Sequence, residues 1–207
     1  ATQQGVNVGD CLYKDISGPE GTPDGVIDAY DQTVLGSGLP KVNFGLSTHM
    51  EYKGFDLNIS TYGVLNYHVS DDIYNSLNSC YGYGNKEVGM LDANRWSEDG
   101  TYLSSVPRTY AANNATLAWN DLFSSRKIQN AAYWKIANVE LGYNFPDKWF
   151  GGYVSGVRLY VSAQNLYTFT GYHGYNVDYA GGTFTPGYNF CSFPSARTFM
   201  AGLHFTF

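Results

Sequence analysis

The sequence predicts an all-β protein in which about five long antiparallel strands form part of the wall of a transmembrane β-barrel. Three observations predict this fold: the composition, a repeated alternation of apolar and polar residues, and the lengths of the connections. Of the 207 residues, 24 are Gly, 19 are Tyr and 12 are Phe. These residue types are typical of strands and turns rather than of helices.

The low charge of the chain excludes several classes of protein. Charged residues make up 14% of the sequence, against about 25% in an ordinary soluble domain. Disordered chains are rich in charge and poor in aromatic residues, so disorder is excluded. The net charge of −6 and the lack of a basic stripe exclude a nucleic-acid-binding module. No apolar run approaches the ~18 residues of a transmembrane helix, but a barrel strand needs an apolar residue only at every second position.

Apolar and polar residues alternate with a period of two in five segments. These segments are residues 42–52, 55–60, 133–145, 157–164 and 199–207. The longer segments exceed the five or six residues of a soluble strand, and about ten residues suffice for a tilted strand to cross a bilayer. Aromatic residues near the segment ends match the interfacial girdles of outer-membrane barrels. A soluble β-sandwich that buries one face of each strand gives the same alternation and stays open as an alternative.

Short and long connections alternate between these segments. Lys53-Gly54 joins the first pair through a tight turn, and residues 146–156 join the third segment to the fourth. Long links of about 66–132 and 171–196 follow the second and fourth segments. Bacterial barrels have short periplasmic turns and long extracellular loops. The pattern therefore predicts that both long links lie outside the cell.

Five strands are too few to close a barrel. Bacterial single-chain barrels have an even number of strands, and an open sheet edge in lipid leaves backbone groups unpaired at several kcal/mol each. We therefore expect residues 1–41 to form an extracellular loop and residues 42–207 to be the C-terminal strands and outer loops of a larger barrel. The opening residues show no signal peptide.

Residues 10–31 carry six acidic side chains against Lys14 alone. The stretch from Asp24 to Asp31 matches the second half of an EF-hand calcium loop, in which clustered oxygens surround the ion. An insertion between Gly18 and Pro23 breaks the first half of the pattern. Two interpretations stay open, a structural calcium site and a solvated acidic turn without metal. The candidate ligands are Asp15, Ser17, Asp24, Val26, Asp28 and Asp31.

The sequence offers no support for enzyme activity. It lacks the GxSxG, HExxH and GxxxxGK[ST] motifs, and no GxGxxG opens a helix. Cys11, Cys80 and Cys191 show no CxxC spacing, so a zinc or redox centre is not indicated. One disulfide with one thiol left over and three unpaired cysteines both stay open. We expect no organic cofactor.

Several blocks resemble, in order, the SusC/RagA family of TonB-dependent outer-membrane transporters. They are Gly9-Asp10 through Lys14-Asp15, Asp24-Gly25-Val26-Ile27-Asp28, Val34-Leu35-Gly36 with Leu39-Pro40-Lys41, Tyr52-Lys53-Gly54-Phe55-Asp56-Leu57, Asn138-Val139-Glu140-Leu141-Gly142-Tyr143-Asn144-Phe145-Pro146, Leu159 through Thr170, and the ending Ala196-Arg197-Thr198-Phe199 with Phe205-Thr206-Phe207. Each block alone is weak evidence for the resemblance, but the blocks together cover most of the chain.

The resemblance implies a barrel of about 22 strands with a plug in its lumen, of which this chain is similar to the last five strands. It implies an integral protein of the bacterial outer membrane that imports oligosaccharides or peptides. The implied partners are TonB, which acts through an N-terminal portion, a SusD-like surface lipoprotein and membrane lipid. The terminal residues Phe199, Leu203, Phe205 and Phe207 resemble the signal that the barrel assembly machinery reads, and they are also the expected lipid face of the last strand.

Two rival functions stay open at this point. A passive porin or structural outer-membrane protein would need further strands within residues 66–132. A secreted carbohydrate-binding β-sandwich would be soluble without detergent and would bury the apolar face of every strand in a protein core.

Overall fold

A computed structural model describes residues 2–80, 84–91, 96–97, 106–109, 119–150, 154–178, 182 and 184–206. The chain divides into two compact units, one of residues 1–36 and 70–128 and the other of residues 37–69 and 129–207. Among the helices described, none is long and apolar enough to span a membrane.

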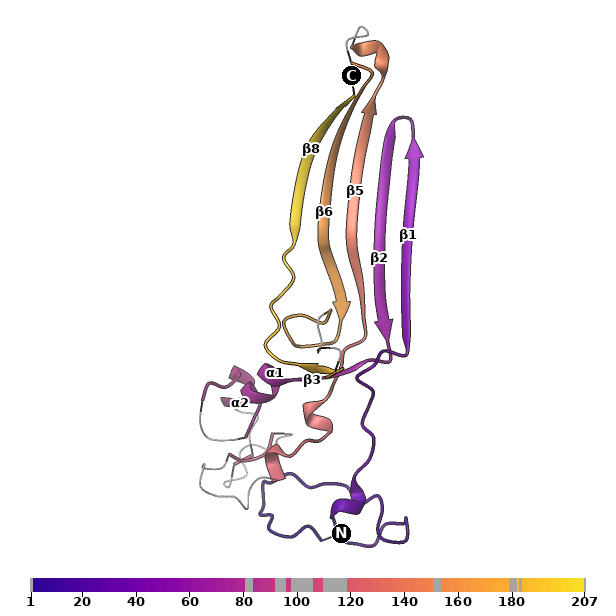
Figure 1. The fold of residues 1–207 in the computed structure, drawn as a ribbon. Helices are drawn as coiled ribbons and strands as arrows, with labels where there is room; N and C mark the ends of the chain where they lie inside the picture. The colour runs from indigo at the N-terminus through magenta and orange to yellow at the C-terminus, as the bar shows by residue number, and fades with distance from the viewer. Residues whose placement is uncertain are drawn as a thin grey trace. The chain divides into compact units, whose positions relative to one another are not determined.

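All five predicted strands are present and form one antiparallel sheet in the second unit. Figure 1 shows them side by side in the order β1-β2-β5-β6-β8. They are β1 (Val42–Tyr52), β2 (Phe55–Leu65), β5 (Tyr133–Phe145), β6 (Gly156–Thr170) and β8 (Thr198–Thr206). Neighbours in the sheet are therefore neighbours along the chain, apart from the short elements inserted in the long connections.

The short connections lie together at one end of this sheet (Figure 1). Lys53 and Gly54 join β1 to β2 with φ angles of 49° and 88°, and two consecutive positive φ values define the hairpin turn that matches the strand twist. Residues 146–155, which include the 3-10 helix η4 (Asp147–Trp149), join β5 to β6. The long connections leave from the opposite end, as the sequence predicts.

Two strands of the sheet are longer than their alternation indicates. β2 continues past Ser60 to Leu65, and β6 continues past Gln164 to Thr170. The pairing register between β2 and β5 shifts at Ser60 and Thr61, where Ala137 of β5 is left unpaired, and the register between β5 and β6 shifts beside Gln164, where Asn165 has a φ angle of 52°. A bulge of this kind inserts an unpaired residue and interrupts the period of two. The extra residue opposite β2 lies on β5, and the predicted segments on β2 and β6 stop beside these irregularities.

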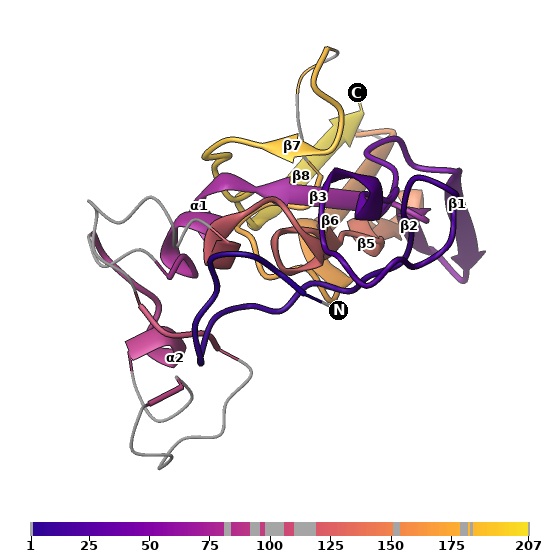
Figure 2. The same cartoon turned by 90° about the horizontal axis from the view of Figure 1, so that it is seen from below.

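The long connections contain short elements. β4 (Gln129–Asn130), β3 (His68–Asp71) and β7 (Tyr188–Asn189) form a small sheet in that order, and Figure 2 shows β3 beside β7. The helices are α1 (Asp72–Leu77), α2 (Val88–Leu91), and the 3-10 helices η1 (Ala29–Asp31) and η3 (Ser125–Lys127). Asp71 caps α1 by accepting a hydrogen bond from the amide of Tyr74.

A cluster of buried apolar residues lies at the loop end of the second unit and not on the apolar face of the long sheet. Its members are Val64, Tyr67, Val69, Ala131, Tyr133, Tyr172 and Val177. Leu141, Val161 and Leu203, at the middle of the long strands, are 44%, 50% and 57% exposed. A β-sandwich would bury these three side chains, so that alternative does not fit the structure.

Candidate functional site

The apolar face of the long sheet carries an aliphatic band between two groups of aromatic rings. The register places Leu57, Leu141 and Val161 in one row across β2, β5 and β6. At the short-turn end the rings of Phe55 and Tyr143 lie 4.6 Å apart. At the loop end the rings of Trp134 and Phe169 stack at 5.2 Å, with Tyr167 beside Phe169.

The separation of the two aromatic groups matches a bilayer. Trp134 and Tyr143 are nine residues apart on β5, which corresponds to about 30 Å at the usual rise per residue. A strand tilt of about 40° reduces this length to about 23 Å along the membrane normal, close to the ~25 Å apolar band of outer-membrane barrels.

The opposite face carries an ion-pair network that links three adjacent strands. Arg158 on β6 donates from Nε and Nη2 to the Asp56 carboxylate on β2 at 3.0 and 2.5 Å. The same Nη2 donates to Glu140 Oε1 on β5 at 2.7 Å, and Asn144 Nδ2 donates to Asp56 Oδ2 at 3.1 Å. Asp56 is only 5% exposed. Its charge is therefore balanced by a neighbour on the same face.

The absence of a side chain at Gly142 leaves the space that this network occupies. Gly142 lies between Asp56 and Tyr160 in the register of β2, β5 and β6. A Cβ atom at this position would come within 2.4 Å of Asp56 Oδ2 and 2.6 Å of Arg158 Nη2. Any other residue would therefore push apart the two side chains that pair across β5.

The polar face extends to β1 and to the loop end. His49 on β1 pairs through Nδ1 with Asn58 at 2.6 Å and through Nε2 with Glu51 at 2.9 Å. At the other end, Lys135 on β5 forms an ion pair with Asp178, which follows β6. A continuous row of polar and charged groups therefore lines one side of the sheet.

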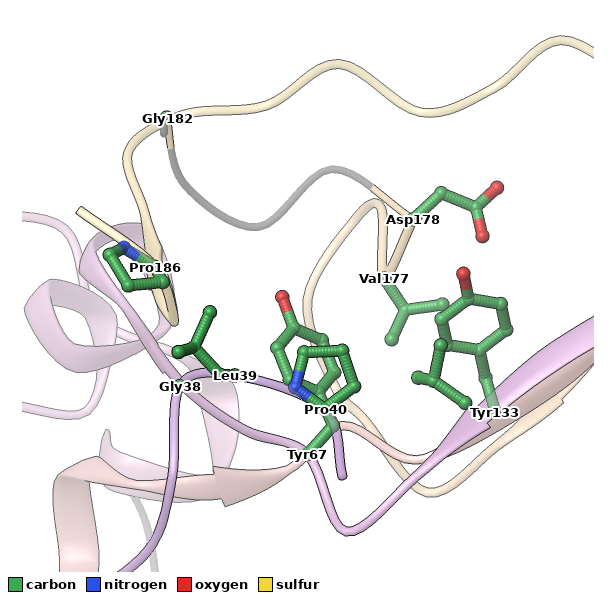
Figure 3. A pocket seen from close by; sticks show the side chains of 10 residues that line it. Gly38, Leu39, Pro40, Tyr67, Tyr133, Val177, Asp178, Gly182 and Pro186 are labelled. Atoms are coloured by element: carbon green, nitrogen blue, oxygen red, sulfur yellow. The ribbon is translucent and has the colours of Figure 1, made fainter. Parts of the chain in front are cut away.

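An open pocket of about 380 Å³ lies beside the Lys135–Asp178 pair. Tyr67, Tyr133 and Val177 line it, and Figure 3 shows the Tyr133 hydroxyl turned toward the Asp178 carboxylate. Burial raises the pKa of Tyr67, so its hydroxyl stays protonated and can donate a hydrogen bond. The volume falls within the range of small-molecule sites, about 300–1,000 Å³.

The predicted calcium ligands lie in the first unit, where their own backbone holds them. Asp31 Oδ1 accepts hydrogen bonds from the amides of Ile16 and Ser17 at 2.7 and 3.1 Å, and Oδ2 accepts one from Asp28 at 2.9 Å. Bonds from the amides of Ile16, Asp28 and Ser17 lower the pKa of the Asp31 carboxyl. This carboxylate therefore closes the turn from both ends.

The remaining predicted ligands are also occupied by local bonds. Asp15, Asp24 and Asp28 each accept a backbone amide, at 2.8, 2.9 and 2.8 Å, and the Ser17 hydroxyl donates to a neighbouring carbonyl. The backbone of Val26 pairs with that of Thr2 in an isolated parallel β-bridge. Over the described part of the chain, no group of three His, Cys, Asp or Glu side chains is arranged to hold a metal ion. Asp15 Oδ1 is buried without a hydrogen-bond partner, and calcium binding stays a prediction.

The residues of the predicted assembly signal lie on the outer side of the last strand. Phe199, Leu203 and Phe205 on β8 share the aliphatic face and are at least half exposed. Phe207 lies outside the described residues. The lipid-facing placement agrees with the sequence, and recognition by an assembly machinery stays a prediction.

These two faces define a class of protein, the antiparallel transmembrane β-barrel, of which this sheet is a wall segment. A solved structure of the RagAB peptide importer in its open-open state has the same fold, with a TM-score of 0.72 and 24% identity. The match covers 93% of this chain and 20% of that chain. The predicted fold class is therefore confirmed.

The sequence relatives of the chain are TonB-dependent receptors, SusC among them, in agreement with the predicted resemblance. TonB-dependent receptor P3 of Formosa agariphila is 30% identical over 204 residues, which are 95% of this chain and 19% of the receptor. TonB-dependent receptor SusC of Bacteroides thetaiotaomicron is 27% identical over 186 residues, 89% of this chain and 17% of the receptor. No family model matches the chain. The chain spans about one fifth of the length of these relatives.

These relatives are named as receptors and an importer, which agrees with the expectation that the chain is not an enzyme. Two functional features were not predicted from the sequence. The Lys135–Asp178 pair joins residues 43 positions apart, and the pocket beside it is lined by residues from Gly38 to Pro186. In the sequence, only the lysine within an apolar strand indicates the pair. A charge at that position requires an inward side chain and a partner.

Proposed function

We propose that this chain forms part of the wall and outer loops of a TonB-dependent outer-membrane transporter, which imports oligosaccharides or peptides together with a SusD-like surface lipoprotein. The observation that carries the proposal is the division of one sheet into an aliphatic face with aromatic girdles and a charged face. Lipid covers the first face, and the second lines a lumen with a plug supplied by other parts of the transporter.

The proposed location is the bacterial outer membrane. In that setting the Lys53-Gly54 turn and residues 146–155 face the periplasm, and the long connections face the outside. TonB acts on the plug from the periplasmic side, and the lipoprotein caps the extracellular loops. The names of the relatives support TonB dependence, and the name of the RagAB peptide importer supports a partner protein.

The pocket supports a role for this segment in substrate contact. Tyr67 and Tyr133, which are 7% and 8% exposed, contribute parts of their rings to its lining, and Asp178, which pairs with Lys135, contributes a carboxylate. Rings that stack and oxygens that bond suit either a sugar ring or a peptide side chain. We propose that the pocket binds one unit of the imported chain as it enters the lumen.

Transport in the native host tests this proposal against the passive porin. The full-length protein should support growth on a glycan or peptide as the only nutrient, and removal of TonB should abolish that growth. A passive porin would keep its uptake without TonB. Growth that is unchanged when the transporter gene is deleted, across a panel of glycans and peptides, would contradict the import function itself.

We also keep a structural calcium ion at the acidic turn as a proposal. The support is the carboxylate density of residues 10–31 and the unpartnered Oδ1 of Asp15. Binding requires Asp24 and Asp28 to turn from their backbone amides toward one ion. Calorimetry on the full-length protein should detect calcium but not magnesium binding, and Asp28→Asn should weaken it at least tenfold. No heat of binding for wild type at millimolar calcium would refute it.

A further inference from the structure

Two of the three cysteines of the chain converge on one guanidinium group. Arg126 Nη1 lies 3.4 Å from Cys11 Sγ and 3.8 Å from Cys80 Sγ. The two sulfur atoms are therefore no farther apart than the sum of these distances, although 69 positions separate the residues in sequence. Both cysteines belong to the first unit, and both are free thiols in this structure.

Neighbouring residues hold the backbones of both cysteines in place. The amide of Cys11 donates to Asn120 Oδ1 at 2.6 Å. The amide of Cys80 donates to the carboxylate of Asp121, the residue that follows Asn120, at 3.1 and 3.2 Å. Adjacent Cα atoms are about 3.8 Å apart, so one dipeptide fixes the separation of the two cysteines. This anchoring makes the approach of the sulfurs a property of the fold.

We propose that Cys11 and Cys80 form a disulfide bond that ties the acidic N-terminal segment to the loop of residues 70–128. The proposal rests on the extracellular location of these loops, because disulfides persist in oxidising compartments. A rotation of the two side chains with withdrawal of Arg126 brings the sulfurs to bonding distance. A shared metal ion is a poor alternative occupant, since a cationic guanidinium already faces both sulfurs.

The bond forms by two exchanges with an external disulfide. The thiolate of Cys11, which is partly exposed, attacks one sulfur of that disulfide and releases the other as a thiolate. The thiolate of Cys80 then attacks Cys11 Sγ and releases the second external thiolate. The two protein thiols are oxidised, the external disulfide is reduced to two thiols, and the two protons pass to the released thiolates. Burial raises the pKa of Cys80, which fits its role as the second nucleophile.

Alkylation of the full-length protein from isolated outer membranes tests the pairing. The protein is denatured with an alkylating reagent but no reductant, and peptides are then identified by mass spectrometry. We expect only Cys191 to be alkylated before reduction, and all three cysteines after reduction. Alkylation of Cys11 and Cys80 without reductant would overturn the proposal.

Two cysteine variants test which thiols pair, and oxidation of the purified protein separates the pairing from the proposed location. Cys80→Ser should make Cys11 reactive without reductant, whereas Cys191→Ser should leave the pair intact. The reduced, purified full-length protein is also exposed to glutathione disulfide, which supplies the oxidant wherever the protein resides in the cell. A Cys11–Cys80 crosslink is expected there, and its absence would refute the pairing independently of the transport function.

Discussion

Single side chains decide which face of the sheet meets water. Arg158 bridges Asp56 and Glu140 across three strands, and Gly142 leaves the space in which they meet. A glycine and two acids on neighbouring strands do not reveal this arrangement in the sequence, because their proximity depends on the register. The polar type of each residue could be predicted, but the network could not.

Loss of Arg158 should weaken the barrel. Arg158→Met leaves Asp56 and Glu140 without their cation, and we expect the free energy of unfolding to fall by about 1–2 kcal/mol, a value reduced for water in the lumen. Heat-modifiability of the full-length protein on gels measures this change. Arg197→Met, at an exposed position just before β8, should have little effect. Equal shifts for the two variants would contradict a structural role of the network.

The acidic turn should respond to low pH through Asp31. Its carboxyl has a lowered pKa in the folded chain, so its stabilising effect is complete above the ordinary value near 3.8 and is lost as the pH falls through the folded value. Hydrogen exchange over residues 15–31, corrected for its intrinsic pH dependence, should stay constant from pH 8 to about 5 and rise below about 3.8. Asp31→Asn should show the fast exchange at neutral pH, and a turn equally protected in this variant would contradict the assignment.

The alternation of apolar and polar residues predicts the ends of some strands correctly and the ends of others too early. The bounds of β1 and β5 agree with the prediction, although β5 carries the unpaired residue Ala137. β2 and β6 extend beyond the prediction, to Leu65 and Thr170, past the points where their pairing with β5 shifts register. The register shift also turns Lys135 to the polar face, where it pairs with Asp178. A strict alternation of period two does not include the unpaired residue that causes this change, so it places Lys135 on the wrong face.

The two faces of β6 should tolerate charge differently. Val161→Arg places a cation near the middle of the aliphatic band, and we expect a loss of about 2–4 kcal/mol. Gln164→Arg, on the same strand but the polar face, should cost less than about 1 kcal/mol. Denaturant unfolding of the full-length protein in lipid vesicles compares the two. A larger loss for Gln164→Arg would reverse the assignment of faces.

The outer face of the last strand should control assembly. Phe205→Ser removes an aromatic residue from the lipid side of β8, and we expect a several-fold decrease in the amount of protein that reaches the outer membrane. His204→Ser changes the neighbouring residue on the opposite face and serves as the control. Quantitative immunoblots of membrane fractions measure both variants. An unchanged level for Phe205→Ser would argue against an assembly signal at this end.

At the scale of the whole molecule, the chain separates a lipid-facing wall from its own small core. The buried cluster around Tyr67 and Tyr133 stabilises the loop end, while Leu141, Val161 and Leu203 at the middle of the sheet are about half exposed among the described residues. The wall could be predicted because a bilayer imposes a simple rule on alternate residues. The loops could not, since their contacts, such as those of Asn120 with Cys11, join distant positions without any periodic pattern.

Spin labels on the full-length protein in membranes test the central claim, that hydrocarbon covers the aliphatic face. The native cysteines are replaced, and single labels are placed at each position from Val157 to Gln164. Labels at Leu159 and Val161 should be accessible to oxygen, which concentrates in lipid, and labels at Tyr160 and Gln164 should be accessible to a water-soluble nickel complex. Labels at Leu159 and Val161 that are shielded from both reagents would place these residues in a protein core and contradict the account.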